Sequence, residues 1–159
     1  MRQLYVTMHQ LRFNHVEIAT QEVPDEIALA ISISGCPLAC HNCHSPHTWN
    51  PNLGELLTSS ALTTLIQSHK HISCVLFYDG LHIESELLPL FSTAHKAGLK
   101  VAFYTGLESV SSSIATNVDY LKVGPYIESL GGLNSPTTNQ RMYYRGTDIT
   151  HKFHSRFIN

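Results

Sequence analysis

Three cysteines that lie close together form the most informative motif of this chain. Cys36, Cys40 and Cys43 are spaced C-x3-C-x2-C within eight residues. Thiolates can hold an iron–sulfur cluster, and a [4Fe–4S] cluster normally takes four cysteine ligands. A loop that supplies three of them leaves one iron with an open coordination position, and open positions on protein-bound metals are where substrates bind. The motif therefore predicts a catalytic cluster, with these three cysteines as both metal ligands and catalytic residues.

A zinc site is an alternative that the motif alone leaves open. Structural zinc normally has four protein ligands, often in two separated pairs, and here His41, His44 or His47 could complete a small zinc site. Disulfides are not expected. The N-terminus has no basic segment followed by an apolar stretch, and no run of about 18 apolar residues follows. We therefore expect a cytoplasmic protein with reduced thiols and no membrane partner.

Alternating apolar runs and helical patterns indicate how the cysteine loop is held. Short runs rich in β-branched and aromatic residues are typical of buried parallel strands, and residues with a 3.6-residue apolar period predict helices between them. The predicted strands are Ile27–Ile33, Cys74–Tyr78, Val101–Tyr104 and Tyr120–Val123, and the predicted helices are Thr58–Ser68, Glu84–Ala97 and Glu108–Ala115. Ser59 or Ser60 is expected to cap the first helix, and Gln3–Thr7 is a weaker candidate for an edge strand.

This order of elements predicts an α/β fold, an open or partial β/α barrel whose sheet is mostly parallel. The 159 residues are too few for a full eight-stranded barrel of about 250 residues, so we expect one domain over residues 1–159. In such sheets ligands gather beyond the carboxyl ends of the strands. The cysteine loop begins directly after Ile33 and therefore lies where ligands are expected.

The composition excludes several classes of protein. With 43% hydrophobic and 14% charged residues, the chain is neither disordered nor membrane-like. The formal net charge of −2 provides no positive surface for nucleic acid. We therefore expect no direct contact with nucleic acid, and any nucleotide chemistry would be carried out through a partner protein.

A C-x3-C-x2-C motif after a buried strand is the signature of the radical S-adenosylmethionine enzymes. The wider pattern resembles one branch of them, the activating proteins of anaerobic ribonucleoside-triphosphate reductase. The resemblance extends over most of residues 26–145. The segments that carry it are Ile31–Pro37, Cys43–Trp49, Tyr120–Tyr126 and Leu130–Tyr143.

This resemblance implies a mechanism. The open iron of a [4Fe–4S] cluster would chelate the amino and carboxylate groups of S-adenosylmethionine, and reduction of the cluster would cleave the cofactor. The resulting 5′-deoxyadenosyl radical would remove a hydrogen atom from a glycine of the large subunit of the reductase. A low-potential electron donor such as a flavodoxin is then required as a second partner. The protein itself would supply position and exclude water.

The sequence departs from the family at one place. Activases usually carry a Gly-Gly-Glu stretch after the second strand, and here Tyr78-Asp79-Gly80-Leu81 stands there. Asp79, with Gly80 beside it, is the candidate replacement, because a carboxylate pairs well with the cofactor's ammonium group. The same Asp-Gly pair also suits a simple tight turn.

Further cofactor-binding candidates follow the third and fourth strands. Tyr104 and Gly106 end the third strand, and Lys122 lies near the end of the fourth, where it could meet the cofactor carboxylate. An ordinary turn and an exposed lysine are the alternatives for these positions. Cys74 lies among apolar residues and is expected in the core. The polar residues of the tail are expected to meet the ligand or the reductase, and they are Asn134, Thr137, Asn139, Gln140 and Arg141.

Two other classes of function remain open. The first is a different radical enzyme, either an activase for another glycyl radical enzyme or a small enzyme that acts on a metabolite. The second is a non-catalytic metal-binding relative that kept the cysteine loop and lost the cofactor site. The altered Tyr78-Asp79-Gly80 stretch supports the second class.

Overall fold

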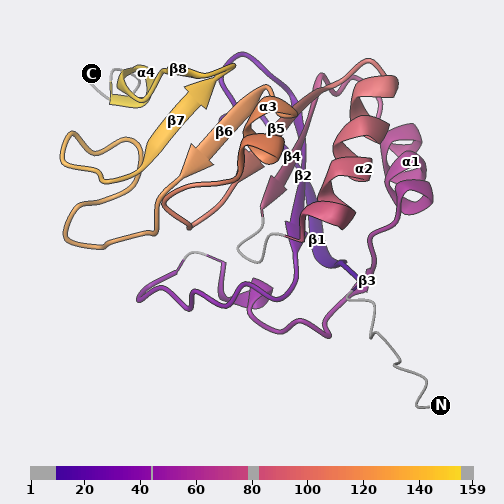
Figure 1. Cartoon of the computed structure of the whole chain (residues 1–159), viewed down its shortest axis with the longest axis horizontal. Coiled ribbons are helices and arrows are strands. Elements are labelled where there is room, and N and C mark those ends of the chain that lie inside the picture. The colour runs from indigo at the N-terminus through magenta and orange to yellow at the C-terminus, as the bar shows by residue number, and fades with distance from the viewer. Residues whose placement is uncertain (1–9, 44, 79–82, 155–159) are drawn as a thin grey trace.

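Eight strands form one open sheet that positions every element of the fold. The structure is a computed structural model, and it describes residues 10–43, 45–78 and 83–154. The sheet order is β3-β1-β2-β4-β5-β6-β7-β8 (Figure 1). The strands are β1 (Arg12–Ala19), β2 (Ala28–Ile33), β3 (Glu55–Leu56), β4 (Cys74–Tyr78), β5 (Lys100–Tyr104), β6 (Tyr120–Val123), β7 (Arg141–Tyr144) and β8 (Thr147–Asp148).

The centre of the sheet is the α/β unit that the sequence predicts. Strands β2, β4, β5 and β6 pair in parallel, and each of the four matches a predicted strand to within one residue at either end. The helices between them are α1 (Ser59–Ser68), α2 (Glu84–Lys96) and α3 (Ser112–Thr116). The prediction of a mixed α/β architecture is therefore confirmed.

The expectation of a mostly parallel sheet is wrong for the sheet as a whole. Within the described residues three pairings are parallel, whereas β1–β2, β1–β3, β6–β7 and β7–β8 are antiparallel. The sheet is open, as expected, but a barrel of the radical S-adenosylmethionine type is not shown. The sequence did not indicate these antiparallel pairings, because strands such as β1 and β7 can join a sheet in antiparallel orientation without a crossover helix. The expected strand Gln3–Thr7 lies outside the described residues.

Helix ends follow local side-chain chemistry. The α1 N-cap is Thr58, whose Oγ1 accepts a hydrogen bond from the Ala61 amide at 3.0 Å, so the expectation of Ser59 or Ser60 is wrong by one or two residues. Helix α2 ends before Gly98, which has φ +79° and closes the helix in a left-handed conformation. Helix α3 begins only after Ser111, which caps it, and is shorter than predicted.

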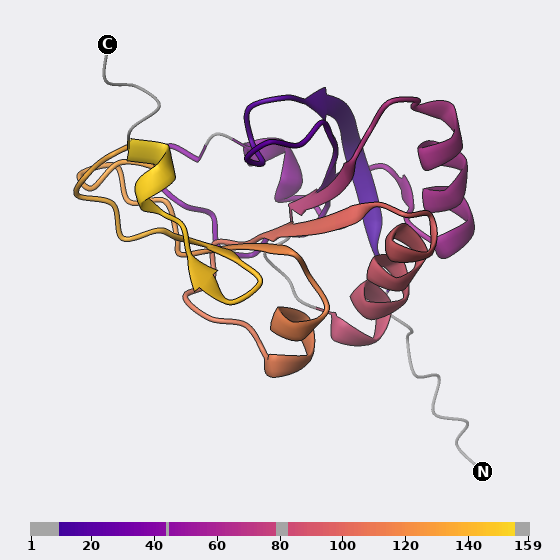
Figure 2. The same ribbon diagram turned by 90° about the horizontal axis from the view of Figure 1, so that it is seen from above.

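Each face of the sheet has its own core. Residues that alternate along the strands point to opposite sides. Leu29, Ile31, Val75 and Phe77 pack against α1, α2 and α3 (Figure 2), and the Phe91 ring of α2 lies 5.5 and 5.7 Å from the rings of the two core residues Phe77 and Phe103. Such aromatic pairs each add about 0.5–1.5 kcal/mol beyond burial.

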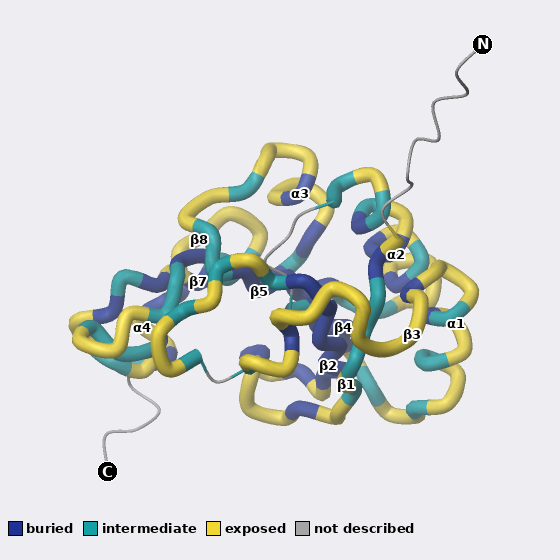
Figure 3. Tube along the Cα trace, turned by 90° about the horizontal axis from the view of Figure 1, so that it is seen from below, coloured by how far each residue is buried: buried dark blue, intermediate teal, exposed yellow. Residues whose placement is uncertain are grey.

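The opposite face carries smaller side chains and remains partly open. Its core contains Ala28, Ala30, Leu76 and Ala102, and helix α4 (His151–His154) reaches it through Phe153. The strands between the two cores are the most buried part of the chain (Figure 3). A cavity lies at the carboxyl ends of the parallel strands. No helix in the described residues is long and apolar enough to cross a bilayer.

A buried polar network lies at the amino ends of the parallel strands. We call this end of the sheet the base. The Glu26 carboxylate, just before β2, is buried and accepts hydrogen bonds from Lys100 Nζ and, at 3.3 Å, from the Tyr120 hydroxyl. Asp119 accepts from the Val101 amide at 2.9 Å and pairs with His95 and Arg145, both at 3.1 Å. Both carboxylates of this network are therefore paired.

Candidate functional site

Backbone hydrogen bonds fix both ends of the cysteine loop. The amides of Gly35 and Cys36 both donate to the carbonyl of Thr48, at 2.6 and 2.9 Å. Thr48 is itself buried and donates its hydroxyl to the Ser45 carbonyl at 2.7 Å. Gly35 has φ +98°, a conformation that side chains disfavour, so glycine permits the sharp turn out of β2.

Strand β1 supports the loop from the side. The Asn14 amide donates to Ser34 Oγ at 2.8 Å and to the His47 carbonyl at 2.9 Å. The Ser34 hydroxyl in turn donates to the Leu53 carbonyl at 2.7 Å. These bonds join the strand before the loop, the strand beside it and the segment after it, so the loop has a defined base on the sheet.

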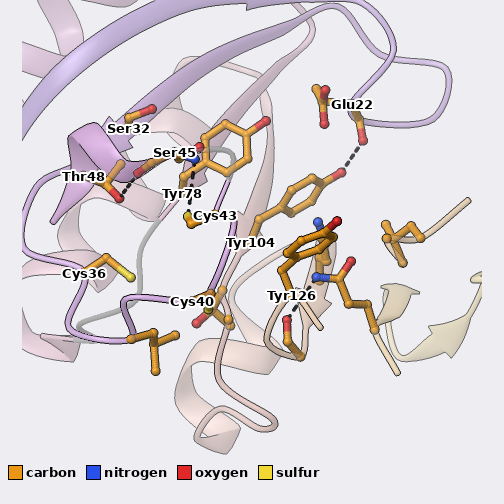
Figure 4. A pocket seen from close by; sticks show the side chains of 18 of the residues that line it. Glu22, Ser32, Cys36, Cys40, Cys43, Ser45, Thr48, Tyr78, Tyr104 and Tyr126 are labelled. Carbon is orange, nitrogen blue, oxygen red and sulfur yellow. Dashed lines mark hydrogen bonds between the residues drawn. The ribbon is translucent and has the colours of Figure 1, made fainter. Parts of the chain in front are cut away.

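The three motif cysteines line one cavity of about 690 Å³ at the carboxyl ends of the parallel strands (Figure 4). All three are half-buried and lie outside any disulfide. Ala39 and Asn42 precede Cys40 and Cys43, and both have positive φ, at +43° and +54°. These left-handed residues turn the chain tightly between the ligand positions, at a cost of about 1–2 kcal/mol each.

One thiol already has a hydrogen-bond donor beside it. The Ser45 amide donates to Cys43 Sγ at 3.3 Å. An N–H group directed at sulfur stabilises negative charge there, and such bonds are one of the means by which proteins adjust iron–sulfur clusters. The three sulfurs do not surround a common point. Among the described residues, no group of three or more His, Cys, Asp or Glu side chains is arranged to hold a metal ion.

The two described histidines that could complete a zinc site each contact another side chain. His41 lies 3.8 Å from the Glu128 carboxylate. His47 lines the cavity with its ring against that of His15, at a centroid distance of 5.7 Å. His44 lies outside the described residues.

One row of side chains crosses the four parallel strands above the core. The pairing register places Ser32, Tyr78, Tyr104 and Lys122 side by side, and all four line the cavity. The Tyr78 and Tyr104 rings meet edge to face at 5.7 Å, and Lys122 Nζ lies 5.5 Å from the centroid of the Tyr104 ring. The register of the sheet therefore brings Tyr104 and Lys122, predicted from separate strands, into direct contact.

Lys122 is a cation without an anionic partner in the part of the chain that the structure describes. Burial lowers the pKa of its ammonium group, and the nearby charge of Glu22 opposes that shift. No carboxylate among the described residues lies within ion-pair distance of Lys122 Nζ, unlike the lysine at the base. A desolvated cation that faces a cavity favours an anionic ligand group.

Tyr104 fixes the floor of the cavity. Its hydroxyl donates to the Glu22 carbonyl at 2.5 Å (Figure 4). Burial raises the pKa of this tyrosine, and burial likewise raises that of Tyr78, which the charges of Glu22 and Glu17 raise further. Both phenols therefore stay protonated at neutral pH and serve as polar aromatic walls.

The remaining predicted residues divide between three outcomes. Gly106 lines the cavity, but a Cβ there would lie 2.5 Å from Leu38 Cδ1, so glycine makes room for the cysteine loop. Asp79 and Gly80 lie outside the described residues. Cys74 is fully buried, as expected.

The polar tail forms a folded segment between β6 and β7 rather than a wholly exposed loop. Thr137 Oγ1 donates to the Leu130 carbonyl at 3.0 Å, and Asn139 Nδ2 donates to the Pro125 carbonyl at 3.0 Å. Asn134 and Gln140 line the cavity, whereas Arg141 is the exposed first residue of β7. Two of the five tail residues thus reach the site.

Sequence reasoning missed the acidic wall of the cavity. Glu17 on β1 and Glu22, in the connection from β1 to β2, both line it. The continuous apolar run that indicates each parallel strand is absent from β1, whose residues are mostly half-buried or exposed. An alternation of polar and apolar residues in His15-Val16-Glu17 was the one available signal.

The donor set fits the cluster and cofactor that the motif implies. Three thiols outside any disulfide share a cavity with Lys122, two carboxylates and aromatic rings, and the Ser45 amide donates to one of these thiols. A cavity of 300–1,000 Å³ suits a ligand of cofactor size. The charges also match a ligand that carries a carboxylate at one place and a cation at another.

Comparison with known proteins agrees with this donor set. The family model described as a 4Fe-4S single cluster domain matches residues 27–141. The match begins at the residue before β2, contains all three motif cysteines and ends at the first residue of β7. Among curated proteins, no match was found.

Proposed function

The chain belongs to the 4Fe-4S single cluster domain family, and from this premise we propose that it is a radical S-adenosylmethionine activase. In this proposal a cytoplasmic, one-domain enzyme generates a glycyl radical on anaerobic ribonucleoside-triphosphate reductase. One observation carries the proposal. The C-x3-C-x2-C thiols and the unpaired Lys122 line the same cavity at the carboxyl ends of the parallel strands.

Cys36, Cys40 and Cys43 would hold the cluster and leave one iron open for the cofactor. When bound, the reduced cluster supplies the electron that cleaves S-adenosylmethionine. The Ser45 amide stabilises negative charge on the Cys43 sulfur. The hydrogen bonds from the Gly35 and Cys36 amides to the Thr48 carbonyl hold the two ends of the cysteine loop together at the end of β2. The protein thus fixes the cluster relative to the cavity.

Lys122 would bind the carboxylate of the cofactor's methionine part. Its ammonium group faces the cavity without a carboxylate partner among the described residues, and a charge-assisted bond in a desolvated site is about twice as strong as a neutral one. Glu17 and Glu22 form an acidic wall of the same cavity. Together with Asp79 they are the candidates to meet the cofactor's ammonium group, in place of the family's Gly-Gly-Glu acid.

Two partners belong to this proposal. The large subunit of the reductase would present its glycine at the open side of the cavity, and a low-potential donor such as a flavodoxin would reduce the cluster. The identity of the reductase rests on the sequence resemblance, which includes the tail that folds over the cavity. The net charge of −2 supports action through a protein partner rather than direct contact with nucleic acid.

The decisive experiment is electron paramagnetic resonance of the anaerobically reconstituted, dithionite-reduced protein, with and without S-adenosylmethionine. The same samples are assayed for 5′-deoxyadenosine. We expect a [4Fe–4S]⁺ signal that shifts when the cofactor is added, together with formation of 5′-deoxyadenosine. A cluster that neither shifts nor supports cleavage would favour the non-catalytic relative, and zinc in place of iron would refute the radical chemistry.

The partner is tested separately. Incubation of the reduced protein, S-adenosylmethionine and the reductase is expected to give the doublet signal of a glycyl radical on the reductase. Cofactor cleavage without this signal, and with a radical on another glycyl radical enzyme instead, would keep the radical chemistry and change the target.

A further inference from the structure

Exposed apolar side chains gather in the segment that follows the cysteine loop. Six large apolar side chains are exposed in the described residues, and three of them, Trp49, Leu53 and Leu56, lie in segment 49–56. Their exposed fractions are 41%, 44% and 37%. Single exposed apolar side chains are normal, whereas a group of them often marks an interaction site. Segment 49–56 is therefore a candidate contact surface for another protein.

The same region of the chain carries no formal charge. Residues 34–54 contain no Asp, Glu, Lys or Arg, although 14% of the whole chain is charged. Charged side chains border this region, because the Arg12 guanidinium donates to the Gly54 carbonyl at 2.9 Å and Glu55 follows directly. Protein interfaces are typically depleted of charge and enriched in aromatic residues at their centre, with a polar rim. The composition around Trp49 matches that pattern.

Local structure ties Trp49 to one of the three cysteines. A single turn of 3-10 helix at Pro46–Thr48 precedes it, and the Trp49 amide donates to the carbonyl of the first residue of that turn at 3.2 Å. The carbonyl of Thr48, the residue before Trp49, accepts from the Cys36 amide at 2.9 Å. One residue and one hydrogen bond thus separate Trp49 from the backbone of a cluster ligand.

The apolar group lies outside the cofactor cavity. The three thiols line that cavity, but Trp49, Leu53 and Leu56 do not. Segment 49–56 leads to β3 at one edge of the sheet, whereas the segment between β6 and β7 lies toward the other edge (Figure 1). A protein that delivers its glycine must enter the cavity. A protein that delivers only an electron must come close to the cluster, and it can do so from the outer side of the cysteine loop.

We propose that Trp49 and Leu53 form the docking surface for the protein that reduces the cluster, a small flavoprotein whose flavin exposes its apolar edge. The inference rests on the proposed function, in which a protein donor supplies the electron. In the docked complex the reduced flavin loses one electron and the oxidised cluster gains it, and no bond forms or breaks in either protein. Electron-transfer encounters bury little surface, less than about 1,200 Å², so a few apolar side chains suffice.

The absence of charge decides how the donor is held. A donor that docks by ion pairs needs a set of charged side chains opposite it, and residues 34–54 provide none. Apolar contact is weakly sensitive to salt, whereas electrostatic steering falls steeply as salt is added. We therefore expect the rate of cluster reduction by the donor to change less than about twofold between about 0.05 M and about 0.5 M salt.

The test compares a protein donor with a small reductant. The full-length protein, anaerobic and loaded with its cluster, is mixed with reduced flavodoxin or with dithionite, and the [4Fe–4S]⁺ signal is followed by freeze-quench electron paramagnetic resonance. Trp49→Ala and Leu53→Ser should each lower the second-order rate constant with flavodoxin about tenfold, since truncating an aromatic or aliphatic anchor weakens an interface. The rate with dithionite and the iron content should stay at the wild-type values, because dithionite needs no docking surface.

Ile18→Ala is the matched control. Ile18 is 45% exposed, and it lies on β1 opposite Leu29, near the amino end of β2 and away from the cysteine loop. This variant removes an exposed apolar side chain of similar accessibility, so its rate with flavodoxin should equal that of the wild type. Calorimetric titration of each protein with oxidised flavodoxin measures docking without any electron transfer, and affinity should fall in the two surface variants alone.

The outcomes separate this inference from the proposed function. Wild-type rates with flavodoxin in Trp49→Ala and Leu53→Ser, a steep dependence on salt, or a wild type that only dithionite reduces would each refute the docking surface. A reduced wild type that forms no 5′-deoxyadenosine would refute the proposed function, and the rates of cluster reduction would still decide the docking surface. Should Trp49→Ala fail to retain its cluster, Leu53→Ser decides.

Two other occupants of the surface are tested with the same variants. If the wild type is a dimer in size-exclusion chromatography and Trp49→Ala is a monomer, the surface holds a second copy of the chain and the inference is refuted. If dithionite-reduced Trp49→Ala cleaves S-adenosylmethionine but forms no glycyl radical on the reductase, the surface belongs to the reductase and the inference is refuted as well. We expect neither result.

Discussion

The two ends of the same parallel strands treat their polar groups in opposite ways. At the base, Glu26 accepts from Lys100 and Tyr120, and Asp119 accepts from a backbone amide, a histidine and an arginine. At the carboxyl ends, Lys122 lines a cavity and has no ion-pair partner among the described residues, and Gln140 Oε1 is buried there without a hydrogen-bond partner among them.

This difference teaches where the chain stabilises its fold and where it holds a ligand. Groups that are paired within the protein contribute to stability, because each buried donor and acceptor is satisfied. Groups that are buried but unpaired weaken the fold and gain their partners only from a ligand. The base is therefore expected to respond to mutation in unfolding experiments, and the carboxyl end in binding experiments.

The largest expected difference is between a cysteine of the motif, Cys40, and the core cysteine, Cys74. Cys40→Ala at the carboxyl end should abolish both cluster assembly and cleavage of S-adenosylmethionine, since a cluster with two remaining protein ligands is not retained. Iron and sulfide analysis with an assay for 5′-deoxyadenosine measures both losses. The fold should be kept, because Cys40 is half-buried and forms no core contact.

Cys74→Ala is the matched control at the base. Cys74 is fully buried in the core, and burial raises the pKa of its thiol to about 12, with the charges of Glu26 and Asp119 raising it further. A protonated core thiol holds no metal, so this variant should keep its cluster and its activity and lose about 1 kcal/mol of stability. Loss of the cluster in folded Cys74→Ala would overturn the ligand assignment.

Replacement of Lys122 should separate cofactor binding from cluster assembly. Lys122→Met keeps the apolar stem and removes the charge, so the cluster should assemble normally. Affinity for S-adenosylmethionine should fall about 10- to 100-fold, the equivalent of one hydrogen bond to a charged group. Titration calorimetry measures the affinity, and the iron content of the same samples is the control. Unchanged affinity would remove Lys122 from the cofactor site and break the contrast between the two ends.

The parallel centre was predictable because its strands are buried on both faces. All six residues of β2 are buried, as are four of the five in β4, and such strands show short, continuous apolar runs rich in β-branched and aromatic residues. The helices α1 and α2 were equally clear, since each covers one face of the sheet and keeps a one-sided apolar pattern. Because the motif follows directly after the predicted strand Ile27–Ile33, its place at the carboxyl end of that strand was predictable as well.

The parts that the sequence did not reveal are those that depend on pairing. Strand β1 is half-exposed and joins β2 by antiparallel hydrogen bonds, so neither its place nor the acidic wall at Glu17 and Glu22 could be read from an apolar run. The position of the Gln140 side chain depends on one bond to the Gly124 carbonyl across the β6–β7 segment. Contacts of this kind are set by tertiary register, which local patterns do not encode.

The central carboxylate of the base should matter for stability alone. Glu26→Ala leaves the Lys100 ammonium without its acceptor and removes one of two acceptors of the Tyr120 hydroxyl, which also donates to the Pro24 carbonyl at 3.1 Å. We expect a loss of about 2 kcal/mol in the free energy of unfolding, measured with urea, and an unchanged cluster content. Glu108→Ala, at an exposed position, should change stability by no more than about 0.5 kcal/mol. A Glu26→Ala protein that folds stably but cannot retain its cluster would contradict the division between the two ends.

The smallest expected effect is a pH dependence at the other carboxylate of the base. Burial alone would raise the pKa of Asp119, but the Val101 amide, His95 and Arg145 together outweigh it and hold the pKa below its ordinary value of 3.8. A carboxylate with a lowered folded-state pKa contributes stability that is fully present above the unfolded value and is lost as the pH falls through the folded value. The stability difference between wild type and Asp119→Asn should therefore stay constant, at about 1 kcal/mol, from pH 7 to pH 5 and shrink below about pH 4. Urea unfolding of both proteins across that range measures it. A stability difference that grew as the pH fell would mean that Asp119 binds a proton more tightly in the folded protein than in the unfolded one. The hydrogen bonds and ion pairs of Asp119 would then not be the source of its contribution to stability.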